Sequence, residues 1–163
     1  MESSLTLIFL SKIEKIQVLQ QVINHNSKEN IKEFYQKNHI EHELFHFDDK
    51  LLLQAINYDL AITRSGASTI SELAYLNIPF VAIPYPYAKD NHQYYNAEFY
   101  EKNKSCWLIM QKDIDDKSFQ DLMIKIFEDQ NEYLTKKNNL IHLTKENTWE
   151  KNKSKLIELI NEN

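Results

Sequence analysis

The chain of 163 residues contains one glycine, Gly66, where average usage would give roughly eleven. Glycine permits a positive φ and lets a ligand come close to the backbone, because it has no Cβ. The stretch ITRSGASTISELA, residues 62–74, keeps the residue that the rest of the sequence lacks. This stretch is therefore the first place to search for a binding site.

Cysteine is equally scarce, since Cys106 is the only one. A single cysteine excludes a disulfide within the chain and fits a reducing cytoplasm. Cys106 stands in the apolar run SCWLIM. This setting favours a buried structural thiol over a reactive nucleophile.

Long hydrophobic runs and an excess of positive charge are also lacking. No run approaches the roughly 18 apolar residues of a membrane span. The short segment SSLTLIFLSKI follows no cationic stretch, so we expect neither a signal peptide nor an anchor there. With 19 basic and 24 acidic side chains the net charge is −5, so we expect no nucleic-acid partner.

Apolar runs alternate with segments of helical spacing along the whole chain. The expected strands are 16–22, 42–47, 59–63, 79–84 and 106–110. The expected helices are 27–38, 48–56, 69–76 and 91–103, followed by helical sequence from Asp115 onward with breaks near Asn131 and Thr148. Strands separated by helices of this length predict βαβ units. We expect an α/β fold, an open parallel-sheet Rossmann-like domain, with residues 1–163 forming a single domain.

Gly66 lies between the expected strand 59–63 and the expected helix 69–76. Ligands of open α/β sheets bind at such strand ends, where helix N–H groups can hold a phosphate. Free N–H groups are expected at Ser68, Thr69 and Ile70. The alternative is that Gly66 merely serves a tight turn.

Two further positions carry open alternatives. Glu72 completes the pattern Thr69-Ile70-Ser71-Glu72, which fits a capping box, but its carboxylate could equally accept hydrogen bonds from a ribose. In NHQYYNAEFY, the amides of Gln93 and Asn96 share one helix face and His92 adds a donor. These groups suit sugar hydroxyls, or they simply form an exposed polar helix start.

Metal binding is not expected. Asp113-Ile114-Asp115 spells a D-x-D triplet, but acids at a helix start explain it without an ion. The histidines 39, 42 and 46 fit no standard zinc spacing. A metal-dependent transferase therefore remains only an alternative.

The segment TRSGASTISELAYLNIPFVAIPYPYAKDNHQYYNA resembles the sugar-nucleotide-binding segment of the MurG-like glycosyltransferases of family 28. The family pattern is R-[SA]-G-A-x-T-x-x-E, then G-[VIL]-P, then P-[YF]-P-x-A-x-x-x-H-Q-x-x-N-A. Here Asn77-Ile78-Pro79 replaces the usual glycine-containing triplet. The earlier stretch HFDDKLLLQAINYDLAITRSG is similar to the family's preceding strand and helix.

The resemblance implies the C-terminal, donor-binding half of a GT-B enzyme of peptidoglycan synthesis. Such enzymes transfer N-acetylglucosamine (GlcNAc) from UDP-GlcNAc to lipid I, which is undecaprenyl-diphosphate-MurNAc-pentapeptide. They work at the cytoplasmic face of the inner membrane, with no metal or other cofactor expected. Carried over, Gly66, Ala67, Ser68 and Thr69 would line the GlcNAc and diphosphate, and Glu72 would hold the ribose. The remaining donor-binding positions are Phe47 (at the uracil), Arg64, His92, Gln93 and Asn96.

The family's domain starts with a strand and a Gly-Gly-Ser-x-Gly loop that nothing here matches. We expect the first βα unit to be missing and MESSLTLIFLSKI to stand in the place of the helix after that loop. The N-terminal half, with lipid I binding and the catalytic base, would come from elsewhere, such as a partner chain. Two alternatives remain open: a small subunit of a two-chain polyprenyl-linked-sugar GlcNAc transferase, and a non-catalytic sugar-nucleotide-binding remnant.

Overall fold

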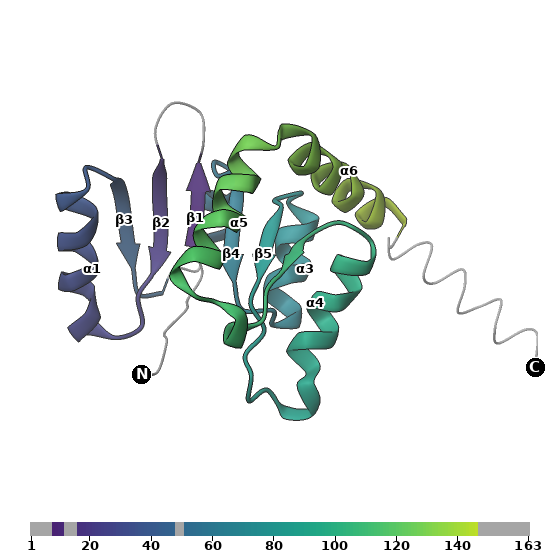
Figure 1. The fold of residues 1–163 in the computed structure, drawn as a ribbon, viewed down its shortest axis with the longest axis horizontal. Helices are drawn as coiled ribbons and strands as arrows, with labels where there is room; N and C mark the ends of the chain where they lie inside the picture. Colours follow the sequence, from purple (N-terminus) through teal and green to yellow (C-terminus); the bar gives the residue numbers. More distant parts are fainter. Residues whose placement is uncertain (1–7, 12–15, 48–50, 147–163) are drawn as a thin grey trace, which may run out of the picture.

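A computed structural model describes residues 8–11, 16–47 and 51–146, and these residues form a six-stranded sheet flanked by helices. The strands stand in the order β3-β2-β1-β4-β5-β6 (Figure 1). Their bounds are β1 Ile8–Ser11, β2 Gln17–Gln21, β3 Glu41–Phe45, β4 Leu60–Thr63, β5 Phe80–Ala82 and β6 Trp107–Leu108. The expected Rossmann-like α/β class is confirmed.

One strand departs from the parallel arrangement. The pairs β2–β3, β4–β5 and β5–β6 are parallel, whereas β1 runs antiparallel to both β2 and β4. Ile8 pairs with Ile62 and Leu10 with Leu60. Residues 8–11 were expected in the place of a helix, and that expectation is wrong. Without β1, the facing edges of β2 and β4 would leave backbone groups unpaired in the middle of the sheet.

The helices alternate with the strands as expected, with ends displaced by one or two residues. They are α1 His25–Lys37, α2 Leu51–Ala55, α3 Ala67–Tyr75, α4 His92–Lys102, α5 Asp116–Glu128 and α6 Gln130–Glu146, with short 3₁₀ turns η1 Lys89–Asn91 and η2 Gln111–Asp113. The break expected near Asn131 falls at Asp129. The start expected at residue 48 and the break expected at Thr148 lie outside the described residues.

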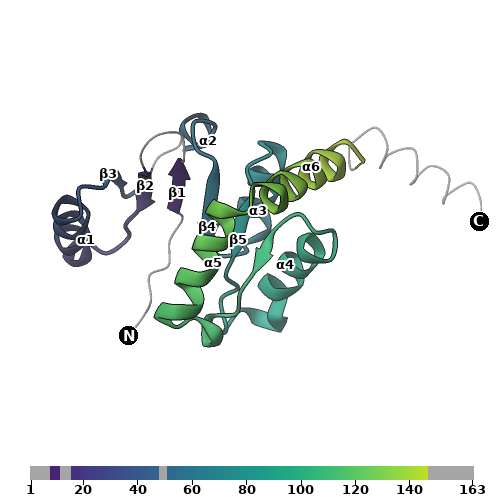
Figure 2. The same cartoon turned by 45° about the horizontal axis from the view of Figure 1, so that its top comes forward.

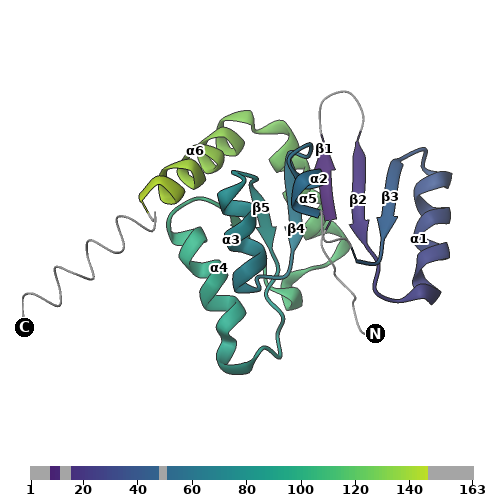
Figure 3. The ribbon, with the colours of Figure 1, turned by 180° about the vertical axis from the view of Figure 1, so that it is seen from behind.

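Two apolar clusters cover the two faces of the sheet. On one face, Ile126 of α5 packs with Val18, Leu60, Ile62 and Val81 of the strands. On the other face, Ile70 and Leu73 of α3 pack with Leu19, Ala61 and Phe80, and α4 and α6 add Ala97 and Leu140. The views in Figures 1 and 3 place α5 on one side of the sheet and α2 and α3 on the other. The tilted view in Figure 2 separates α1, beside β3, from the other helices.

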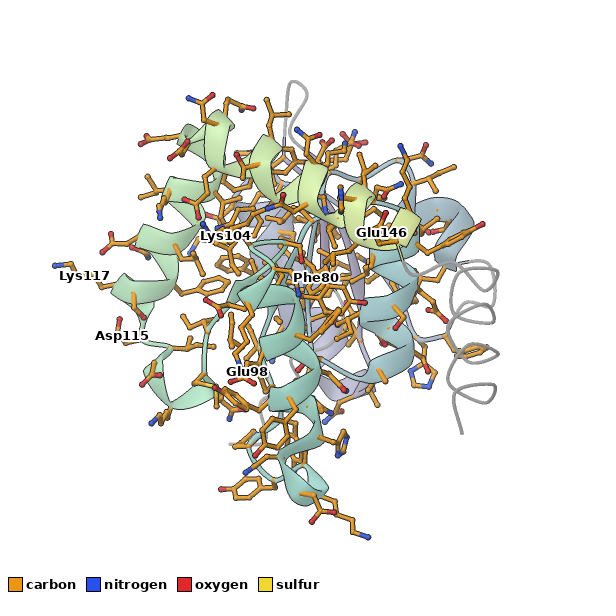
Figure 4. All side chains as sticks on the ribbon, turned by 90° about the vertical axis from the view of Figure 1, so that its right-hand side faces the viewer. Phe80, Glu98, Lys104, Asp115, Lys117 and Glu146 are labelled. Atoms are coloured by element: carbon orange, nitrogen blue, oxygen red, sulfur yellow. The ribbon has the colours of Figure 1, made fainter. Side chains whose placement is uncertain are left out.

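Phe80 marks the centre of the second cluster. Its side chain is fully buried, and its ring meets that of Tyr100 edge to face at 5.3 Å between centroids. In Figure 4 it is labelled between α4 and α3, with α6 passing above. Strand β5 is thus held between helices on both faces, which fixes the position of the loop that leaves its carboxyl end.

Helix α3 ends in a Schellman motif. The Ile78 N–H donates to the Leu73 carbonyl and the Asn77 N–H to the Ala74 carbonyl, each at 3.0 Å. This motif requires a left-handed residue after the helix, and Asn77 takes that place with φ 57°. Asparagine therefore occupies the left-handed position that is usually a glycine in this motif.

Candidate donor-binding site

The candidate site lies where β4 and β5 end and α3 and α4 begin. Both strands point the same way, so their carboxyl ends share one edge of the sheet. This edge is at the bottom of Figure 1, beside the loop that precedes α4. The expected motif residues 64–72 and 92–96 therefore come from two neighbouring strand-to-helix connections.

Gly66 is the N-cap residue of α3, but it does not use the conformational freedom of glycine. Its φ is −62° and its ψ 137°, which any residue adopts. A Cβ built on Gly66 would meet only Thr69 Oγ1, at 3.9 Å. The positive φ that glycine permits is not used, and neither strain nor packing against the described residues requires a glycine here.

The free amides of α3 begin earlier than expected. The Ile70 N–H already donates to the Gly66 carbonyl at 3.1 Å, so it is not available to a ligand. The residues whose N–H groups have no acceptor one turn earlier are Ala67, Ser68 and Thr69. Ala67 and Ser68 are exposed at the surface.

The capping box that was one alternative for Thr69 and Glu72 does not form. The helix starts at Ala67, two residues before the expected start, which places Glu72 in the second turn. Glu72 is exposed, and its carboxylate has no hydrogen bond or ion pair to the described part of the chain. This side chain has no structural role among those residues.

Gln93 and Asn96 of α4 both bond to Ser65, Asn96 through its side-chain amide and Gln93 through its backbone carbonyl. Asn96 Nδ2 donates to the Ser65 carbonyl at 3.1 Å, and the buried Ser65 hydroxyl donates to the Gln93 carbonyl at 2.7 Å. Gln93 Oε1 accepts from the Tyr85 N–H at 3.0 Å. The Asn96 amide and the Ser65 hydroxyl therefore join the β4–α3 connection to α4, whereas the Gln93 amide joins α4 to the loop that precedes it. Each side-chain amide forms its hydrogen bond through only one of its two polar atoms, Oε1 in Gln93 and Nδ2 in Asn96.

The Arg64 guanidinium forms hydrogen bonds with other parts of the protein. One of its terminal nitrogens, Nη1, donates to the carbonyls of Ile83 and Pro84 at 3.2 and 3.3 Å. The other, Nη2, donates to Gln111 Oε1 at 2.7 Å. Burial lowers the pKa of the guanidinium below its ordinary value, although arginine remains protonated in proteins. Sequence reasoning missed Gln111, which lies 47 positions away from Arg64 and in no motif.

His92 begins α4 after an unusual turn. Asp90 and Asn91 both have φ 53°, in the left-handed region that asparagine and aspartate tolerate best. The His92 ring uses Nδ1 to contact the Lys89 carbonyl at 2.7 Å. The ring is exposed, so its Nε2 side faces away from this contact.

Phe47 lies apart from the other expected positions in the sheet order. It follows β3, and β2 and β1 stand between β3 and β4. Its side chain is 80% exposed. The position is at the same edge as Gly66, because β2, β3 and β4 run in one direction.

The D-x-D triplet and Cys106, the other candidate reactive groups, have structural roles. Asp115 caps α5: its Oδ1 accepts from the Ser118 N–H at 2.6 Å, and this bond with that of the Ser118 hydroxyl lowers the pKa of the carboxyl. Within the described part of the chain, no three His, Cys, Asp or Glu side chains gather as a metal site. Cys106 is buried, as expected, and burial raises its thiol pKa to about 12.

Together these features define a doubly wound α/β domain with a helix amino end and two amide side chains at its ligand-binding edge. The model of the glycosyltransferase family 28 C-terminal domain matches residues 2–157. The chain therefore belongs to this family of glycosyltransferase domains.

Individual relatives agree with this placement. A protein of Pelagibacter ubique (strain HTCC1062) named UDP-N-acetylglucosamine--N-acetylmuramyl-(pentapeptide) pyrophosphoryl-undecaprenol N-acetylglucosamine transferase is 43% identical over 157 residues, or 96% of this chain. A protein of Rickettsia canadensis (strain McKiel) with the same name is 40% identical over 76% of the chain. The crystal structure of Acinetobacter baumannii MurG superposes on 82% of the chain with a TM-score of 0.65 at 21% identity, a likeness of fold.

The chain spans less than half the length of these relatives. It covers 44% of the Pelagibacter protein, 36% of the Rickettsia protein and 41% of the Acinetobacter structure. Among residues 8–11, 16–47 and 51–146, no helix is both long enough and apolar enough to cross a bilayer.

Proposed function

We propose that this chain binds UDP-GlcNAc as the donor-binding part of a transferase that converts lipid I to lipid II in peptidoglycan synthesis. The observation that carries the proposal is the setting of Gly66. A chain with one glycine places it at the ligand edge of the sheet, where a Cβ would meet only Thr69 Oγ1, at 3.9 Å, in the described structure. The need for glycine then comes from a ligand that approaches the backbone.

The amino end of α3 is the proposed diphosphate site. The N–H groups of Ala67, Ser68 and Thr69 point to the region beside Gly66, and the helix dipole adds partial positive charge. The Glu72 carboxylate, which is committed to nothing else in the described chain, is proposed to accept the two ribose hydroxyls. The remaining polar atoms of Gln93 and Asn96, with His92, are proposed to bind the sugar, and the backbone at Phe47 the uracil.

Leaving-group stabilisation follows from the same geometry. When the bond between GlcNAc and diphosphate breaks, negative charge grows on UDP. Amides fixed in advance at a helix end stabilise that charge without rearrangement. We assign no base to this chain. The base that takes the proton of the acceptor hydroxyl and the site for lipid I belong, in this proposal, to an N-terminal half or partner chain at the cytoplasmic face of the inner membrane.

The proposal includes no metal ion. The Asp115 carboxylate of the D-x-D triplet is used to cap α5, so the two acids do not form a matched pair of ligands. The amino end of α3 supplies the positive field instead. We expect EDTA to leave the affinity for UDP-GlcNAc unchanged.

Isothermal titration of the purified chain with UDP-GlcNAc tests the proposal. We expect saturable binding, weaker binding of UDP-glucose, and loss of binding in Gly66→Val, whose side chain would occupy the open space beside the amides. Absence of binding to the folded wild-type chain at millimolar UDP-GlcNAc would overturn the proposal and favour a non-binding remnant.

A further inference from the structure

We propose that Arg64 and Gln111 form a positioning clamp that holds the loop of residues 84–91 against the amino end of α3. The inference rests on the proposed function in one respect: the ligand whose binding the loop position controls is the nucleotide sugar. The role of the clamp in holding the loop is independent of that ligand. Neither residue is a catalytic residue in this proposal.

The guanidinium ties together three consecutive strand ends. Arg64 follows β4, the carbonyls of Ile83 and Pro84 follow β5, and Gln111 begins η2 just after β6. Both terminal nitrogens donate to these protein acceptors. A planar fork of donors fixes the direction of each acceptor as well as its distance.

Tyr85 is the residue of the loop on which the clamp acts. The Arg64 guanidinium carbon lies 5.5 Å from the centroid of the Tyr85 ring, within cation–π range. The Tyr85 N–H donates to Gln93 Oε1, and its ring meets Tyr87 edge to face at 5.7 Å. The start of the loop is thus held by its carbonyls, its amide and its ring together.

This arrangement links Arg64 to the proposed sugar-binding amide. Gln93 accepts from Tyr85 through Oε1, so the position of Tyr85 sets the orientation of the Gln93 amide and the direction of its Nε2. The loop also donates from the Ala88 N–H to the Tyr85 carbonyl at 3.1 Å. Displacement of the guanidinium would therefore displace the loop and turn the amide.

A substitution at Gln111 can weaken the clamp without changing any residue proposed to contact the ligand. Gln111 Oε1 accepts from Arg64 Nη2 at 2.7 Å, the shortest of the three hydrogen bonds described above, and Gln111 is not one of the residues proposed to contact the ligand. Gln111→Leu removes the acceptor and leaves a half-buried charged donor without it, which is costly. Gln111→Glu keeps the acceptor and adds charge complementarity. Lys112→Leu, an exposed neighbour in η2, is the matched control.

The test combines amide hydrogen exchange by NMR, titration with UDP-GlcNAc, and thermal melting on the full chain. For Gln111→Leu we expect exchange at Tyr85 and Ala88 and the dissociation constant for UDP-GlcNAc each to rise on the order of tenfold, the equivalent of one lost charged hydrogen bond. Gln111→Glu and Lys112→Leu should retain wild-type exchange and affinity.

Two results would overturn the clamp. One is Gln111→Leu with wild-type exchange at Tyr85 and Ala88. The other is Gln111→Glu with the same loss as Gln111→Leu, which would mean that the acceptor at this position is not what holds the loop. If the wild-type chain binds no UDP-GlcNAc, the proposed function fails, while the exchange measurement still decides whether the clamp exists.

Discussion

Asn96 donates a hydrogen bond from its side-chain amide to the backbone carbonyl of Ser65, 3.1 Å away, and so joins α4 to the turn that precedes α3. A second hydrogen bond runs from the Ser65 hydroxyl to the backbone carbonyl of Gln93. Ser65 is completely buried, and both hydrogen bonds are partly buried. The two halves of the candidate site are therefore joined into one corner.

Asn96→Asp should disrupt this corner with almost no change of shape. The carboxylate oxygen that replaces Nδ2 would face the Ser65 carbonyl as a second acceptor. We expect the free energy of unfolding to fall by about 1 to 3 kcal/mol, the cost of an unsatisfied, partly buried polar group, and UDP-GlcNAc binding to weaken. Urea denaturation and calorimetry measure the two effects. Wild-type stability of the variant would show that the bond has little weight.

Gly66→Ala should separate folding from binding. The native φ of −62° suits alanine, and the Cβ would make only a van der Waals contact with Thr69 Oγ1. Alanine is a poorer N-cap than glycine, but it also lowers the entropy of the unfolded chain, and these opposing effects are each about 1 kcal/mol or less. We expect an unchanged melting temperature and weaker UDP-GlcNAc binding. A large loss of stability would mean that glycine serves the fold after all.

Asn77→Gly should stabilise the domain. Asn77 holds φ 57°, and its Oδ1 is buried without a hydrogen-bond partner in the described structure. Glycine removes both the left-handed strain and the unsatisfied oxygen, so we expect a gain of about 1 kcal/mol in the free energy of unfolding. Asn77→Ala removes the oxygen but keeps a Cβ at positive φ, and it should be less stable than Asn77→Gly. Urea denaturation ranks the three proteins, and equal stabilities would contradict this account.

The sequence predicted features that depend on residues close together in the chain, and it could not predict contacts between residues far apart in the chain. Local patterns located the alternating strands and helices, and they predicted the shared face of Gln93 and Asn96, because these depend on neighbouring residues. The pairing of Arg64 with Gln111 joins residues 47 positions apart, and no periodicity reveals it.

Strand β1 shows the same limit for the backbone. Its apolar sequence fits a helix or a strand equally well over so short a run. Only the place between β2 and β4 makes it a strand and sets its antiparallel direction. The start of α3 was misplaced for a related reason, because Thr69 and Glu72 match a capping pattern that the earlier Gly66 N-cap displaces.

Cys106 should resist modification until the domain unfolds. Burial raises its thiol pKa to about 12, so almost no thiolate exists in the folded chain at neutral pH. The folded state holds this proton more tightly than the unfolded state, whose thiol pKa is about 8.5. The resulting stability is present below that pH and is lost as pH rises toward 12.

Reaction with a thiol reagent at pH 8, with and without urea, measures the protection of Cys106. Melting curves from pH 8 to 11 measure the linkage, which Cys106→Ala should reduce. Part of the alkaline slope should remain, because burial raises the pKa of Tyr133 to about 12 as well. Rapid labelling of the folded chain would contradict the buried position.

Glu72→Gln tests the proposed ribose contact most directly. The side chain is exposed and has no partner in the described chain, so its replacement should change the melting temperature little. The amide can accept through only one oxygen and its NH₂ group would face a hydroxyl as a donor, so the pair of hydrogen bonds from a ribose to a carboxylate is lost. Because hydrogen bonds to charged groups contribute about 1.5 to 3 kcal/mol, we expect UDP-GlcNAc affinity to fall at least roughly tenfold.

Glu128→Gln, an exposed acid on α5, is the matched control for net charge. Equal affinities of Glu72→Gln and Glu128→Gln would remove Glu72 from the site, whereas a drop in Glu72→Gln alone, with both melting curves unchanged, would place a ligand at this carboxylate.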